Sequence, residues 1–158
     1  MNPNPQFWHD KRVLLTGHTG FKGGWLAIWL KRLGARVTGI SLPPSTDINL
    51  FTLAKIESIC EQSHLCDIRD ASLLTPLIRE AKPQIVLHLA AQPLVRASYR
   101  EPVETFATNF MGTVHLLEAL RALSTVKVAV MITTDKVYSN IEWRWPYRED
   151  SPSRRVNC

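Results

Sequence analysis

The stretch "RVLLTGHTGFKGG", residues 12–24, joins a short apolar run to a glycine-rich loop and then to a helical pattern. Its glycines spell G-x-x-G-x-x-G at Gly17, Gly20 and Gly23. A dinucleotide pyrophosphate at a helix N-terminus needs glycine for the tight turn, for close approach of backbone to phosphate and for close packing of helix on strand. Glycine is common in turns, but its place here, between a strand and a helix, favours a dinucleotide-binding loop.

The rest of the chain repeats this alternation of strand and helix. Pro76 falls inside the third expected helix and should kink or shorten it, whereas Asp70 can cap its start. The alternation predicts βαβ units with right-handed crossovers, so the expected fold class is α/β with a doubly wound parallel sheet of the Rossmann type. The expected strands span 12–16, 36–40, 64–68, 84–91 and 126–133, and the expected helices span 23–34, 48–60, 70–81 and 102–123.

Length and composition fit one soluble globular domain of 158 residues, 45% of them hydrophobic. The formal charge of +5 comes from 19 Lys and Arg with no run longer than two, so no nucleic-acid partner is expected. No apolar stretch approaches the roughly 18 residues of a membrane span, and the N-terminus lacks a signal-peptide pattern. We therefore expect a cytoplasmic protein with no membrane partner.

Three cysteines, Cys60, Cys66 and Cys158, lack the paired spacing of a zinc or redox site. His64 lies between the first two, but a metal there would need a fourth ligand and a rigid loop. We expect reduced thiols and no metal.

Several candidate binding residues fall where the expected strands end. Ser41 occupies the position after the second strand where an acidic residue usually binds the ribose of NAD, and arginine, which would favour NADP, is also missing there. The choice between NAD and NADP therefore stays open. Asp67 and Ile68 end the third expected strand, where a carboxylate can accept from the adenine amino group and an apolar side chain can pack on the ring. Ala90 and Ala91 end the fourth, so all these residues should share one sheet edge.

Five separated motifs, in order, resemble the N-terminal half of the CDP-glucose 4,6-dehydratases, within the extended short-chain dehydrogenase/reductases. They are "TGHTGFKGGWL", "DIRD", "HLAAQPLVRASY", "EPVETFATNFMGTVHLLEALR" and "TTDKVYSNIEWRWPYRED", and they cover about residues 6 to 150. The resemblance implies an NAD-holding doubly wound sheet, followed in the family by a smaller part that grips the nucleotide sugar. The implied contacts are Gly17, Thr19, Gly20, Phe21, Lys22 and Gly23 for the pyrophosphate, Asp67 and Ile68 for the adenine, Leu89, Ala90, Ala91 and Gln92 for the ribose side, and Asn109 as the residue that organises the active site.

The same resemblance assigns the catalytic residues Thr134, Asp135 and Lys136, which follow the fifth expected strand. In the family, C4 of the hexose gives hydride to NAD, water leaves across C5 and C6, and the hydride returns to C6. Thr134 would hold the C4 oxygen and Asp135 would protonate the departing hydroxyl. Lys136 replaces the glutamate that serves as base in the dTDP-glucose dehydratases, and it would act either as the base or by stabilising the enolate.

The tyrosine–lysine pair that the family needs, Y-x-x-x-K, does not occur in the 158 residues. Tyr99, Tyr138 and Tyr147 are followed four positions later by valine, glutamate and serine. We therefore expect a catalytically incomplete chain. The resemblance also stops sharply near Asp150, which suggests an incomplete NAD-binding domain at 1–150, a divergent tail at 151–158 and no sugar-nucleotide-binding part, as a frameshift or truncated gene product would give.

A doubly wound sheet that ends after its fifth strand should leave that strand as an open edge with one apolar face uncovered, which favours self-association or homo-oligomers. Two other functions stay open. One is a non-catalytic NAD(P)-binding module, and the other is a fragment of a different nucleotide-sugar dehydratase or epimerase.

Overall fold

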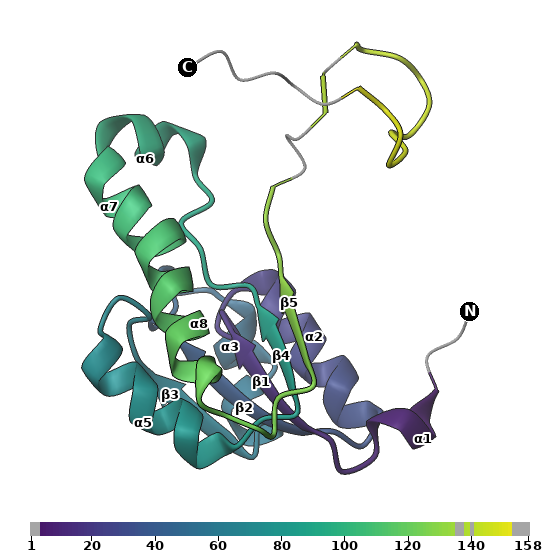
Figure 1. The fold of residues 1–158 in the computed structure, drawn as a ribbon, viewed down its shortest axis with the longest axis vertical. Coiled ribbons are helices and arrows are strands. Elements are labelled where there is room, and N and C mark those ends of the chain that lie inside the picture. Colours follow the sequence, from purple (N-terminus) through teal and green to yellow (C-terminus); the bar gives the residue numbers. More distant parts are fainter. Residues whose placement is uncertain (1–3, 135–137, 140, 153–158) are drawn as a thin grey trace.

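The computed structural model describes residues 4–134, 138–139 and 141–152. Its centre is a parallel sheet of five strands in the order β3-β2-β1-β4-β5, which confirms the expected fold class (Figure 1). β2 and β3 lie on one side of β1, and the chain then crosses to the other side, where β4 and β5 lie. The strand order therefore reverses between β1 and β4, and open α/β sheets bind ligands at such a switch point. The strands are β1 Arg12–Thr16, β2 Arg36–Ser41, β3 Gln62–Leu65, β4 Ile85–His88 and β5 Val128–Met131.

Helices cover both faces of the sheet and enclose two hydrophobic clusters. One face carries α2 Phe21–Arg32, α3 Leu50–Leu53 and α4 Ile56–Ile59, and the other carries α5 Ala71–Ala81 and α8 Gly112–Arg121. Before α8, the same continuous helix contains α7 Pro102–Phe106 and a π-helical turn, η1 Ala107–Met111. Two further short helices are α1 Pro5–Trp8 and α6 Val95–Arg100.

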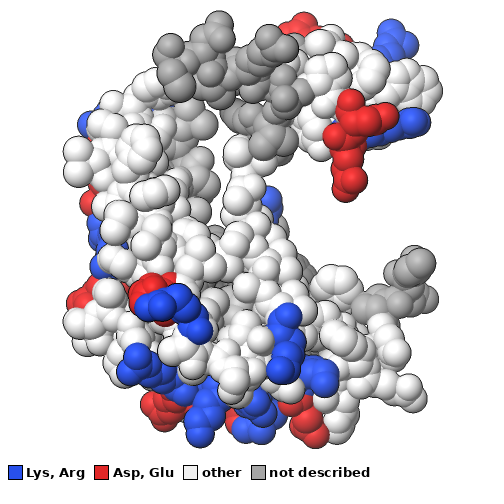
Figure 2. Space-filling model, viewed as in Figure 1, with Lys and Arg blue, Asp and Glu red and all other residues white. Residues whose placement is uncertain are grey.

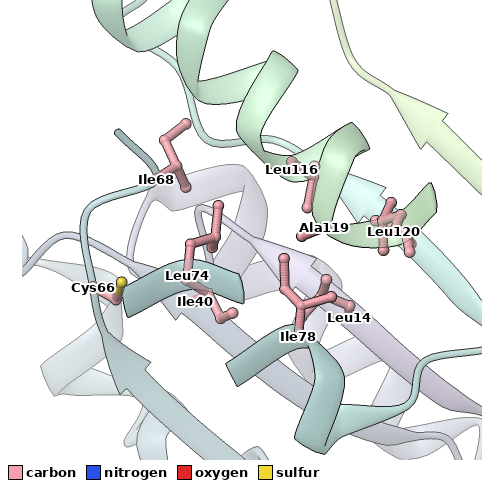
Figure 3. Close-up of a cluster of buried hydrophobic side chains, with 10 residues drawn as sticks. Leu14, Ile40, Cys66, Ile68, Leu74, Ile78, Leu116, Ala119 and Leu120 are labelled. Atoms are coloured by element: carbon pink, nitrogen blue, oxygen red, sulfur yellow. The ribbon is translucent and has the colours of Figure 1, made fainter. Parts of the chain in front are cut away.

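Alternation along the strands divides the core between the two faces. Val13 and Leu15 pack under α2, whereas Leu14 points to the opposite face and packs with Leu74 of α5 and Leu116 of α8 (Figure 3). All five of these side chains are at most 1% exposed. Truncating such a leucine to alanine typically costs about 2 to 5 kcal/mol of unfolding free energy, so this packing fixes the sheet beneath the site.

Several expectations for local structure differ from the structure. The fourth strand, expected at 84–91, ends at His88, so Leu89, Ala90 and Ala91 follow the strand. The helix expected at 48–60 is two short helices, because Lys55 adopts a left-handed backbone with φ 51° between them. The third strand ends at Leu65, so Asp67 and Ile68 lie in the loop after the strand. Pro76 was expected to kink or shorten α5, and the helix is not shortened, since it runs to Ala81 as expected.

The first long helix, α2, buries small residues and leaves its tryptophans partly exposed. Trp25 and Trp29 are each about half exposed, at 53% and 52%. The buried positions of α2 include Gly23, Ala27 and Leu30. Small residues bring this helix close to the sheet, and the larger rings remain toward solvent.

The cap of α5 was predicted correctly. Asp70 Oδ1 accepts hydrogen bonds from the backbone N–H of Ser72 and Leu73 at 3.0 and 3.1 Å. These bonds satisfy two of the unpaired amides in the first turn.

β5 is the edge strand of the described sheet and pairs in parallel with β4. Val128, Val130 and Ile132 alternate along it and are 40 to 50% exposed. Their register partners Ile85 and Leu87 belong to the cluster on the α2 face. The expected open edge with an uncovered apolar face is therefore present in the described part of the chain.

Among the described residues, no helix is both long and apolar enough to cross a membrane. The described part of the chain also contains no group of three potential metal ligands. Cys60 and Cys66 are buried free thiols, and burial raises the pKa of Cys60 to about 11. On the face drawn in Figure 2, basic and acidic side chains lie close together around the lower part of the molecule.

Candidate dinucleotide site

Gly17 begins the loop between β1 and α2 and brings two strand ends together. Its φ of +78° is a left-handed conformation that glycine adopts without strain. Its N–H donates to Ile40 O at 2.8 Å, and a Cβ at this position would lie 2.9 Å from Ala90 N. The loop therefore touches β2 and the end of β4, and this contact requires glycine.

The other two glycines serve the start of α2. A Cβ at Gly23 would lie 2.0 Å from Gly17 O. The helix therefore packs closely on the glycine loop, whereas close packing on the strand was predicted. Gly20 is the N-cap, and a Cβ there would meet only Gly17 O, at 3.4 Å. No side chain caps the N-terminus of this 12-residue helix, so the backbone N–H groups of its first turn can donate to an anion. Phe21 and Lys22 are exposed in the same turn.

Thr19 and Ser41 tie the glycine loop to the end of β2. Thr19 Oγ1 donates to Leu42 O at 2.9 Å and lies 2.8 Å from Ser41 Oγ. Since the Thr19 proton is used on the carbonyl, the Ser41 hydroxyl must donate to Thr19. Both side chains are buried, so Ser41 acts here as an internal brace and leaves only acceptor capacity on its oxygen.

Asp67, the expected adenine acceptor, lies half-buried in an ion-pair cluster after β3. Its carboxylate accepts from Arg69 Nε and Nη2, and Arg69 also pairs with Glu104 of α7. The hydrogen bonds from Arg69 lower the pKa of Asp67, so this carboxyl stays ionised at neutral pH. Arg69 thus links the loop after β3 to the long helix.

Ile68 is mostly committed to the core and is only 4% exposed. A Cβ at Gly112 would lie 2.6 Å from Ile68 Cδ1, so α8 approaches this loop closely because it begins with glycine. Little of the Ile68 side chain is therefore accessible to an adenine ring, which it was expected to contact.

The end of β4 is held by Asn109 of the π-helical turn. Asn109 Oδ1 accepts from Gln92 N at 2.7 Å, and its Nδ2 donates to Gln92 O at 3.0 Å. This pair of bonds fixes the segment that follows Leu89, Ala90 and Ala91. Asn109 therefore positions a loop and is more than a polar residue on a helix face.

Two buried histidines near the site were missed by the sequence analysis. His18, inside the glycine loop, has its Nε2 2.8 Å from Ser63 Oγ of β3 and its ring against Phe51. The ring of His88, the last residue of β4, is hydrogen-bonded to the hydroxyl groups of Thr16 and Thr113. Burial lowers the pKa of both rings, to about 4 for His18. A polar residue in the apolar run "QIVLHLAA" was the signal for His88, whereas nothing local distinguishes His18.

Of the three expected catalytic residues, Thr134 lies three positions after β5 and is exposed. Asp135 and Lys136 lie outside the described residues. Every expected cofactor residue lies at or just beyond the carboxyl end of a strand, or on the helix that packs there, as predicted.

The fold and this arrangement define the chain as a Rossmann-type α/β protein whose glycine loop opens at the switch point of the sheet. The sequence model described as GDP-mannose 4,6 dehydratase matches residues 14–158. The chain belongs to this family. It is 53% identical to CDP-glucose 4,6-dehydratase of Salmonella typhimurium over 92% of its own length and is thus a homologue of that enzyme.

Solved structures with the same fold include two epimerases. UDP-glucose-4-epimerase from Stenotrophomonas maltophila, with bound NAD and formylated UDP-arabinopyranose, superposes with a TM-score of 0.76 at 26% identity, covering 94% of this chain and 44% of that one. UDP-glucose 4-epimerase from Thermotoga maritima, with UDP-glucose, gives 0.77 at 25% identity, with 91% and 45% covered. The chain spans about 40% of the length of the curated relatives it matches.

Proposed function

We propose that this chain is the NAD-binding part of a nucleotide-sugar 4,6-dehydratase that acts on CDP-glucose. The observation that carries the proposal is the close contact of Gly17 with the end of β4, where a Cβ would lie 2.9 Å from Ala90 N. This contact puts the glycine loop beside the ribose-side residues at one sheet edge. The homology to CDP-glucose 4,6-dehydratase supports the substrate.

The residues present fit a dinucleotide. The glycine cradle leaves room for backbone to approach phosphate, and the uncapped start of α2 offers N–H donors beside Lys22. Asp67 is ionised and can accept from an adenine amino group. When bound, NAD supplies the transient oxidation at C4 by taking and returning a hydride.

NAD is preferred over NADP in this proposal. A 2′-phosphate at the end of β2 would need a cationic partner, but that end carries Ser41, Leu42 and Pro43. Ser41 donates its proton to Thr19 and so offers no donor to a phosphate.

Thr134, Asp135 and Lys136 are proposed as the dehydration residues, with the roles that the family resemblance gives them. Thr134 would hold the C4 oxygen, Asp135 would act as general acid, and Lys136 would act as base or stabilise the enolate. The 158 residues contain no Y-x-x-x-K pair, so we expect this chain by itself to bind NAD without turnover.

Two assays test the proposal. The purified chain, mixed with NAD and CDP-glucose, should give no alkaline absorbance of a 4-keto-6-deoxy sugar, and product would refute the claim of incompleteness. A chimera in which residues 1–150 replace the matching part of the Salmonella typhimurium relative should form product and lose at least 100-fold in kcat on Asp135→Asn. A folded chimera that turns over other nucleotide hexoses but not CDP-glucose would contradict the proposed substrate.

A further inference from the structure

The ring of His88 joins two parts of the site that are distant in sequence. The side chain is 4% exposed at the end of β4. Its Nδ1 lies 2.7 Å from Thr16 Oγ1 of β1, and its Nε2 lies 3.1 Å from Thr113 Oγ1 of α8. These two bonds place the ring between the sheet and α8, and Figure 1 shows where β1, β4 and α8 lie.

The proton on the Thr113 side can be placed by following the hydroxyl. Thr113 Oγ1 donates to Asn109 O at 2.8 Å, one helical turn earlier. That bond uses its only proton, so the oxygen must accept from His88 Nε2. His88 is therefore protonated on Nε2.

The Thr16 side gives the same answer independently. Thr16 Oγ1 accepts from the backbone N–H of Ala90 at 3.1 Å and from that of Leu89 at 3.1 Å, which it shares with the Thr16 backbone oxygen at 3.2 Å. Its two lone pairs are used, and its own proton is left to donate to His88 Nδ1. A protonated Nδ1 would find no acceptor there, so the neutral ring satisfies every polar atom of the group.

The bonds from His88 continue to the loop after β4. Thr113 holds the carbonyl of Asn109, which lies in the π-helical turn, and the Asn109 amide holds both backbone groups of Gln92. π-helical turns inside α-helices occur frequently at functional sites. The polar chain thus runs from the end of β1, beside the glycine loop, to Gln92.

We propose that His88 is a positioning residue: its neutral, Nε2-protonated ring fixes the π-helical turn that carries Asn109 and so orients the Gln92 loop. His88 is not among the residues expected to contact a ligand, and its ring is hydrogen-bonded to Thr16 and Thr113. That the Gln92 loop lies on the ribose side of the cofactor rests on the proposed function, but the hydrogen-bond chain does not.

The first test uses the unmodified chain without cofactor. Nitrogen-15 spectra of the histidine ring at pH 7.5 should show a protonated Nε2 and an unprotonated Nδ1 for His88. A proton on Nδ1 would overturn the proposal, and this result needs no variant that might fail to fold.

The second test compares two isosteric variants by amide hydrogen exchange. Thr113→Val removes the link to His88, and the Gln92 amide should exchange about 5- to 10-fold faster while the Leu15 amide in the core of β1 keeps its rate. Thr125→Val is the control, because the Thr125 hydroxyl is buried with no partner in the described structure. Unchanged exchange at Gln92, or equal acceleration at Leu15, would overturn the positioning role.

A third readout separates this inference from the proposed function. In Thr113→Val, NAD affinity measured by calorimetry should fall by a similar factor, and Thr125→Val should bind as the unmodified chain does. If the unmodified chain does not bind NAD, the proposed function fails, while the ring spectra and exchange rates still decide the role of His88. If NAD binds equally to both variants although Gln92 exchange is faster, the link between this loop and the cofactor is refuted.

Discussion

Single residues at this site work through burial and close contact more than through exposed charge. His18 shows this most clearly, because its ring is fully buried under the glycine loop and a Cβ at Gly39 would lie only 2.5 Å from it. The ring is uncharged near neutral pH, since burial lowers its pKa to about 4. The glycine loop is thus anchored in the core by one of its own residues, a neutral histidine.

His18 should make stability depend on pH. Its folded pKa of about 4 lies below the unfolded value of 6.5, so the unfolded chain binds the proton more readily. Stability is then full above about pH 6.5 and falls as the pH drops toward 4, by on the order of 3 kcal/mol, and His88 acts in the same direction. Urea unfolding between pH 7.5 and 4.5 measures this loss.

The matched variants are His18→Phe and His9→Phe, because His9 is exposed at the surface. In His18→Phe, the slope of unfolding free energy against pH should fall by the amount that corresponds to the uptake of about one proton. In His9→Phe, the slope should stay unchanged. Equal slopes for His18→Phe and the unmodified chain would show that His18 is protonated equally in the folded and unfolded states.

Two alanine substitutions should separate folding from cofactor binding. Gly23→Ala places a Cβ 2.0 Å from a backbone oxygen, so we expect a loss of about 2 kcal/mol or more of unfolding free energy. Gly20→Ala has an ordinary φ of −74° and a 3.4 Å contact, so stability should change by less than about 0.5 kcal/mol while NAD affinity falls at least 10-fold. Calorimetry that finds unchanged NAD affinity in Gly20→Ala would remove the pyrophosphate from this loop.

At the scale of elements, the features that depend on hydrophobic periodicity and on glycine could be predicted from the sequence. The parallel sheet, the cap at Asp70 and the tight turn at Gly17 followed from local pattern. The break at Lys55 did not, because a left-handed lysine carries no signal in composition. The hydrogen-bond partners of His88 could not be predicted either, since they come from elements 25 and 72 residues away.

The contact between α8 and the loop after β3 gives a test of element packing. Gly112→Ala would place a Cβ 2.6 Å from Ile68 Cδ1, and the strain should exceed the helix propensity that alanine gains, for a net loss of about 1 to 2 kcal/mol. Adding Ile68→Val removes Cδ1 and should restore part of the loss in a double-mutant cycle from urea unfolding. Additive effects of the two substitutions would mean that the residues are not in contact.

At the scale of the whole molecule, we expect the uncovered face of β5 to determine whether the chain associates in solution. Val128, Val130 and Ile132 give the edge strand an exposed apolar stripe, and the N–H and C=O groups on its open side are available for pairing. We expect the isolated chain to self-associate with rising concentration.

Val130→Lys should weaken this association, because a charge on the stripe of an edge strand opposes pairing. Leu53→Lys is the control, since Leu53 is an exposed leucine of α3 and does not belong to β5. Sedimentation velocity over a concentration series should show smaller species for Val130→Lys only. A chain that stays monomeric throughout, or a Leu53→Lys variant that dissociates equally, would place the association elsewhere.

The central claim is that the carboxyl edge of this sheet binds NAD, and a calorimetric titration of the folded chain with NAD tests it most directly. We predict one saturable site per chain, with weaker or no binding of NADP at the same concentrations. A chain that is folded by circular dichroism yet shows no NAD binding, or that binds NADP more tightly, would contradict the account.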